Sequence, residues 1–215
     1  MGVMVFSIEN VKKSAKDTNP LIAFASVLLG GMFLYESVTT FTLLNTFDIK
    51  GLLLVVLGIL STITLVGYGI KNIYPFGFAN GMLAIPVLYY VVKLIHLFVN
   101  TSALALITEN IFLLFANSAI LWFVFEFASL ENEINISPKK KKTLLAIAIA
   151  TILFADVAAM PKLILALLQK NEMAKGDISA SLLMLAQAFF VFAYIHSNFA
   201  KSKDANQEAI GKHSV

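Results

Sequence analysis

Six long apolar stretches occupy most of this chain, and lysines fall between them on alternating sides. We identify the stretches as residues 21–44, 51–70, 78–99, 104–127, 143–168 and 178–199. A bilayer core about 30 Å thick needs roughly 20 apolar residues for each helical span. In lipid, only helices and closed barrels satisfy their own backbone hydrogen bonds. The pattern therefore predicts an all-α membrane protein, a six-transmembrane-helix bundle.

The distribution of lysine predicts the orientation of this bundle. If the N-terminus is inside the cell, eleven lysines lie on the inner side and three on the outer side, with Lys93 and Lys162 within spans. Such a bias follows the positive-inside rule for short loops. We therefore expect both termini to be cytoplasmic and the protein to lie in a bilayer, in a bacterial cytoplasmic membrane. The expected division is a cytoplasmic N-terminal segment (1–19), a transmembrane domain (20–200) and a cytoplasmic C-terminal tail (201–215).

Composition and missing motifs argue against several classes of function. The chain is 59% hydrophobic and 13% charged, which is far from soluble composition. It has no cysteine, so thiolate chemistry and disulfides are excluded. It also lacks the G-x-x-x-x-G-K-[ST], H-E-x-x-H and G-x-S-x-G motifs. We therefore expect no catalytic residue, no metal site, no cofactor and no nucleic-acid partner, and an enzyme is disfavoured.

Polar side chains inside the spans are the candidates for function, because ionisable groups at membrane depth are costly and usually face protein or a water-filled cavity. Tyr89, Lys93 and His96 follow one another at i, i+4 and i+7, so they form one stripe on a helix. Such faces, packed together, predict a polar cavity that opens outward and binds a substrate or an ion. The candidates are Glu36, Tyr89, Lys93, His96, Glu109, Asn117, Asp156, Lys162 and Gln187.

Structural pairing of these acids with the lysines is the alternative to a binding site, and for Asp156 it would be a buried Asp–Lys pair. Lys162 lies six residues after Asp156, on a different face, so its partner should come from another helix. Glu126 and His196 lie near the inner ends of their spans, where they are candidates for an inner gate or a proton relay. Their alternative role is interfacial.

Two functions fit these features. The first is transport of a small solute or ion, or binding of a small polar or ionic substrate within the membrane. The second is a non-catalytic accessory, scaffold, immunity or regulatory subunit of another membrane complex. An alanine face on the fifth span, formed by Ala146, Ala150, Ala155 and Ala159, could contact another helix or a partner membrane protein.

Size, six spans and cytoplasmic termini are similar to those of the substrate-capturing subunits of energy-coupling-factor vitamin transporters. Those subunits carry an A-x-x-x-A face on their first helix, whereas here Ala23 is followed by Val27. The chain is therefore not assigned to that family.

Overall fold

The computed structural model describes residues 19–43, 49–74, 77–100, 107–132, 138–168 and 175–212, with the backbone alone for residues 100, 107–110, 138, 141, 175–177 and 199–212. The elements in chain order are α1 (Pro20–Leu43), α2 (Ile49–Lys71), the 3-10 turn η2 (Asn80–Leu83), α3 (Ala84–Asn100), α4 (Ile107–Asn132), α5 (Pro138–Leu168) and α6 (Lys175–Lys212). Within these ranges six helices are long and apolar enough to cross a membrane, and strands are absent. The prediction of an all-helical chain with six helices long and apolar enough to span a membrane is confirmed in the described residues.

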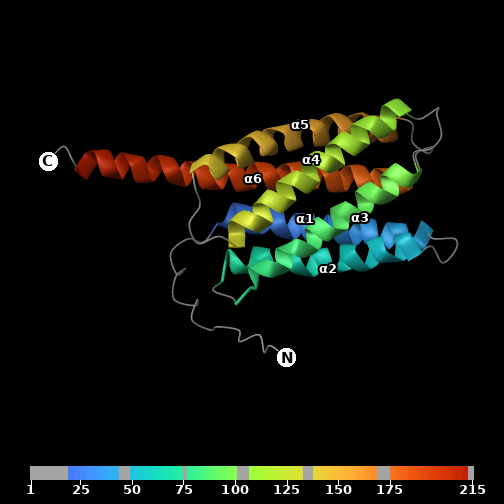
Figure 1. Ribbon diagram of the computed structural model, residues 1–215, viewed down its shortest axis with the longest axis horizontal. Coiled ribbons are helices and arrows are strands. Elements are labelled where there is room, and N and C mark those ends of the chain that lie inside the picture. Colours follow the sequence, from blue (N-terminus) through green and yellow to red (C-terminus); the bar gives the residue numbers. More distant parts are fainter. Residues whose placement is uncertain are drawn as a thin grey trace.

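The helices form a closed ring. Each helix packs mainly against its neighbours in the sequence, and α6 packs against α1 to close the circle. Successive helices run in opposite directions, so α1 begins at the same end of the bundle at which α6 leaves it (Figure 1). We call this the proximal end, and we call the end at which α1 finishes the distal end. Under the lysine rule the proximal end is predicted to be cytoplasmic.

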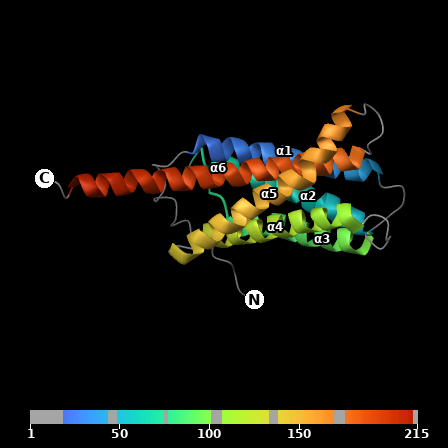
Figure 2. The ribbon, with the colours of Figure 1, turned by 90° about the horizontal axis from the view of Figure 1, so that it is seen from above.

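The helical limits differ from the predicted spans at several places, and most at the ends of the fourth and sixth helices. The fourth span is Ile111–Asn132 and therefore continues past Phe127, through Glu131. Helix α6 continues to Lys212, well beyond the apolar segment Ile178–Asn198. Figure 2 shows this extension projecting past the other helices. The predicted N-terminal segment lies outside the described residues, apart from Asn19.

Glycines allow α1 and α2 to pack closely. A methyl group on Gly58 would overlap the Ser37 hydroxyl, and one on Gly69 would lie 3.0 Å from the Ala23 carbonyl oxygen. The Thr62 hydroxyl donates to the Gly30 carbonyl oxygen at 3.1 Å across the same contact. Small residues are common where membrane helices approach, because little hydrophobic force drives association within lipid.

Most hydroxyl side chains within the spans are satisfied by their own helix. Ser26, Ser37 and Ser61 each donate to the carbonyl oxygen four residues earlier, at 2.7 to 2.8 Å. Such local bonds satisfy a buried hydroxyl without a partner from another helix. These residues therefore do not by themselves mark a polar site.

The alanine face of α5 is buried within the chain in its second half. Ala155 and Ala159 are completely buried, whereas Ala150 is half-buried and Ala146 is exposed. The Thr151 hydroxyl donates to the Ala119 carbonyl oxygen at 3.0 Å and so joins α5 to α4. The outside of the ring carries many exposed large apolar side chains from every span. That surface suits contact with lipid.

Candidate functional site

Glu36 of α1 and Lys93 of α3 form an ion pair inside the bundle. The Lys93 Nζ lies 2.7 Å from the Glu36 Oε1, and the Tyr89 hydroxyl donates to the Glu36 Oε2 at 2.7 Å. The side chains of Glu36 and Lys93 are each only 9% exposed. Both carboxylate oxygens thus have a partner. Three of the predicted candidates come together here. Glu36 and Lys93 neutralise each other, and Tyr89 completes the hydrogen bonds of the carboxylate.

Aromatic rings fix the position of this ion pair. Phe33 contacts the rings of Tyr89 and Tyr90 edge to face, with centroid distances of 4.8 and 5.8 Å. Tyr89 and Tyr90 also contact each other, at 5.3 Å. The Lys93 Nζ lies 5.6 Å from the centre of the Tyr89 ring, within range of a cation–π interaction. The Tyr90 hydroxyl is buried and has no hydrogen-bond partner within the protein.

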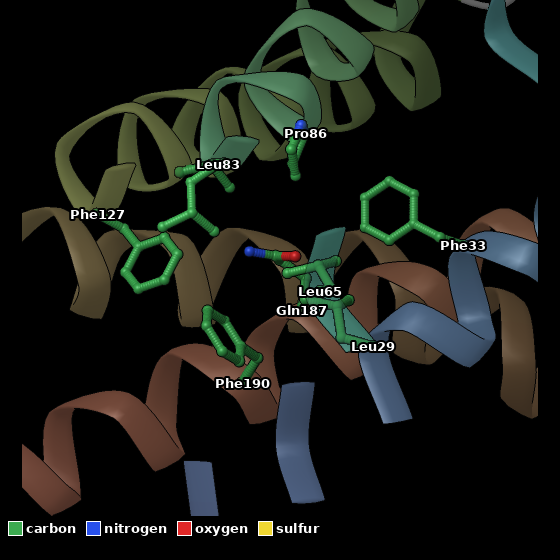
Figure 3. Close-up of a pocket in the computed structure, with 9 residues that line it drawn as sticks. Leu29, Phe33, Leu65, Leu83, Pro86, Phe127, Gln187 and Phe190 are labelled. Atoms are coloured by element: carbon green, nitrogen blue, oxygen red, sulfur yellow. The ribbon is translucent and has the colours of Figure 1, made fainter. Parts of the chain in front are cut away.

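A small cavity lies in the middle of the ring, and every span except α5 contributes to its wall. It offers about 10 Å³ to the centres of water molecules, which is the lower limit for holding one water. Its lining residues are Leu29, Phe33, Leu65, Leu83, Pro86, Val124, Phe127, Gln187 and Phe190. Figure 3 shows the carboxamide of Gln187 lying between the apolar side chains that surround this space.

Gln187 is the polar member of the cavity wall, and its hydrogen bonds are not made within the protein. The residue is 1% exposed, and neither Oε1 nor Nε2 has a hydrogen-bond partner. Burying such a group without a partner costs roughly 1–3 kcal/mol on mutational scales. The empty space beside this amide is bordered by apolar atoms, so a guest reaches the amide when the surrounding side chains move.

Further polar groups lie on the distal side of this cavity. Phe33 and Pro86 line the cavity. Glu36 lies three residues beyond Phe33, and Lys93 lies seven residues beyond Pro86, or roughly 5 and 10 Å further towards the distal end. Asn117 occupies the same level on α4, seven residues distal to the lining Val124. Asn117 is completely buried. Its Nδ2 donates to the Leu113 carbonyl oxygen at 2.7 Å, but its Oδ1 has no partner within the protein.

The proximal side of the cavity is closed by aromatic side chains. Tyr68, Phe123, Phe127, Phe190 and Tyr194 form what we call the proximal aromatic cluster. Phe127 is central to it, with ring centroids 5.3 Å from Tyr68, 5.4 Å from Phe190 and 5.0 Å from Tyr194. These rings leave an apolar wall between the cavity and the proximal end.

Glu131 caps this cluster. The Tyr68 hydroxyl donates to the Glu131 Oε1 at 3.0 Å, and the Tyr194 hydroxyl donates to the same oxygen at 3.4 Å. The Asn80 side chain donates to the Glu131 carbonyl oxygen and accepts a hydrogen bond from the Lys71 Nζ at 2.6 Å. Glu131 was not predicted as a site residue, because it lies beyond the expected end of the fourth span. Its signal in the sequence would have been a helical face shared with Phe127.

The structure does not bring the remaining candidates to the cavity wall. His96, Glu126, Asp156 and Lys162 are half-buried, and His196 is exposed, with its ring 6.0 Å from that of Phe192 on the same helix. The side chain of Glu109 lies outside the described residues. No three His, Asp or Glu side chains gather to hold a metal ion in the described part of the chain.

No protein family, no curated protein and no solved structure matches this chain. Its function is therefore inferred from geometry and chemistry alone.

Proposed function

We propose that this six-span protein binds a small polar solute at the Gln187 cavity and moves it along the axis of the ring. The observation that carries the proposal is the Gln187 carboxamide, which is buried and has no partner at either polar atom. Stability alone would favour an apolar residue at this position, because an unsatisfied buried amide destabilises the fold. A guest that completes its hydrogen bonds accounts for a glutamine there.

The two sides of the cavity differ in polarity, which supports a route with a preferred direction of entry. On the distal side, Tyr90 and Asn117 each leave a polar atom unused. On the proximal side, Phe127 and Phe190 separate the cavity from Glu131. A solute would therefore enter from the distal end, and the proximal aromatic cluster would have to move before it could leave.

The Glu36–Lys93 pair supports the site without binding the solute. Each charge is neutralised by the other, and Tyr89 completes the carboxylate. The pair joins α1 to α3 beside the route, so its role is to hold the ring closed at that level. This assigns Glu36, Tyr89 and Lys93 to structural pairing and leaves Asn117 and Gln187 as binding residues.

The proposal is tested by flux in proteoliposomes. Purified full-length protein is reconstituted, and the vesicles are assayed for the passage of water, urea, K⁺ and Cl⁻ against protein-free vesicles. We expect at least one of these to pass faster with the protein, and the Gln187→Leu variant to lose the increase. The matched control is Asn198→Leu, which makes the same kind of change on the same helix at an exposed position.

The following results would contradict the proposed transport function. If no solute passes faster than through lipid, transport is refuted. A stoichiometric partner protein, found by native mass spectrometry after gentle purification, would then favour the accessory-subunit alternative.

A further inference from the structure

The wall of the Gln187 cavity restricts what its guest can be. Gln187 contributes an amide that can both donate and accept hydrogen bonds. The other eight lining residues are apolar. Both the nitrogen and the oxygen of this amide are unused and lie behind the apolar atoms that border the cavity. A guest that reaches them when these side chains move must accept one hydrogen bond and donate another.

Charge is poorly accommodated in this cavity. None of the nine described residues that line it is ionisable. The buried charges next along the route are Glu36, three residues beyond the lining Phe33, and Lys93, seven residues beyond the lining Pro86, which is roughly 5 and 10 Å along their helices. They neutralise each other at 2.7 Å. An ion placed among apolar side chains without a counter-charge loses most of its solvation, at a large cost in free energy. The cavity therefore discriminates against cations and anions alike.

Size makes the restriction stronger. Space for about one water centre admits a water molecule, or a compact solute after small movements of the surrounding side chains. Phe127 and Phe190 on one side and Phe33 on the other leave no room for a ring or a long chain (Figure 3).

We infer that the substrates of this protein are small neutral molecules that both donate and accept hydrogen bonds, with water and urea as the representatives to test. The inference depends on the proposed transport function and names its substrate class. Along the route, the Tyr90 hydroxyl and the Asn117 Oδ1 supply further unused hydrogen-bonding groups. The discriminating residue is Gln187, because it is the polar group in an otherwise apolar wall.

Stopped-flow light scattering measures this directly. Vesicles containing the full-length protein are mixed with sucrose to report water permeability and with urea to report urea permeability, and K⁺ and Cl⁻ fluxes are measured in the same preparation. We expect water or urea permeability to rise above that of protein-free vesicles while ion flux stays at the background. Gln187→Leu should lower the added permeability roughly tenfold, as expected when one hydrogen-bonding group is lost.

Each outcome decides a separate point. Faster K⁺ or Cl⁻ flux without faster water or urea passage would overturn the substrate class while leaving transport intact. Water or urea passage that survives in Gln187→Leu would overturn the role of this cavity. Gln187→Met, which nearly matches glutamine in shape, is measured in parallel so that a folding defect in the leucine variant does not decide the result. Both variants are checked for helical content before reconstitution.

Discussion

The Glu36–Lys93 pair makes the sharpest prediction about stability. Replacing Glu36 with glutamine keeps the shape of the side chain but leaves the Lys93 ammonium without its counter-charge. Replacing Lys93 with methionine leaves the carboxylate with the Tyr89 hydroxyl as its remaining partner. The double variant removes both charges together. These three variants form a double-mutant cycle.

The expected size of the effect comes from the observed separation and burial. At 2.7 Å, and with an effective dielectric constant of about 20, the gross attraction is roughly 6 kcal/mol. Part of this offsets the cost of taking both charges out of water. Removing one partner of a buried pair typically costs about 3–5 kcal/mol, because the remaining charge stays buried. We expect each single variant to lose about 3 kcal/mol, at the lower end of this range. The double variant should regain most of that loss.

The free energy of unfolding can be followed by titration with sodium dodecyl sulfate in mixed micelles. Far-UV circular dichroism reports the helices, and Trp122, the single tryptophan, gives a second signal. Lys142→Met is the matched control, because it removes a lysine that is exposed at the start of α5. It should change the free energy by less than about 0.5 kcal/mol.

Two results would refute the reasoning. If Glu36→Gln costs no more than the Lys142→Met control, the pair is hydrated and the burial argument is wrong. If the losses in the single variants simply add in the double variant, the two charges do not stabilise each other.

Three further changes test the packing, the proximal closure and the orientation. Gly58→Ala should lower the free energy of unfolding by about 1–3 kcal/mol, because the added methyl group overlaps a hydroxyl of α1. Gly31→Ala is the control: its methyl group meets nothing within 4 Å, so the free energy of unfolding should stay the same or rise by up to about 1 kcal/mol. Tyr68→Phe should cost about 1 kcal/mol and Tyr194→Phe clearly less, because the hydrogen bonds of these hydroxyls to the Glu131 carboxylate are 3.0 and 3.4 Å long. Equal losses in the same detergent titration would contradict this ranking. Because the chain has no cysteine, Lys142→Cys gives a single thiol, which an impermeant maleimide should label only after cells are opened.

The number of spans could be predicted because hydrophobicity is a local property of the chain. A run of about 20 apolar residues commits a segment to a helix in lipid whatever its neighbours are. The stripe of Tyr89 and Lys93 was also predictable, because two residues four positions apart share a helical face. Glycines such as Gly58 and Gly69 lie at helix contacts because small residues let membrane helices approach closely.

The residues that make up the site were harder to predict from the sequence. Glu36, Lys93 and Tyr89 were all candidates, but their mutual pairing depends on how α1 and α3 are rotated and how deep each lies. Gln187 was a candidate among nine, and nothing in the sequence set it apart from Asp156, which does not reach the cavity. Glu131 was missed because its partners, Tyr68 and Tyr194, come from helices far away in the sequence.

The sequence by itself determined six helices, their alternating directions and the residues that are too polar to face lipid. Tertiary structure alone decided that α6 closes the ring against α1, that Glu36 neutralises Lys93, and that the Gln187 amide is left without a partner. The physical reason is that lipid-facing and core-facing surfaces of these helices are both apolar, so hydrophobicity fixes insertion but not rotation. Rotation is set by close packing at small residues and by hydrogen bonds between helices. Both are relations among distant residues, which a local pattern leaves open.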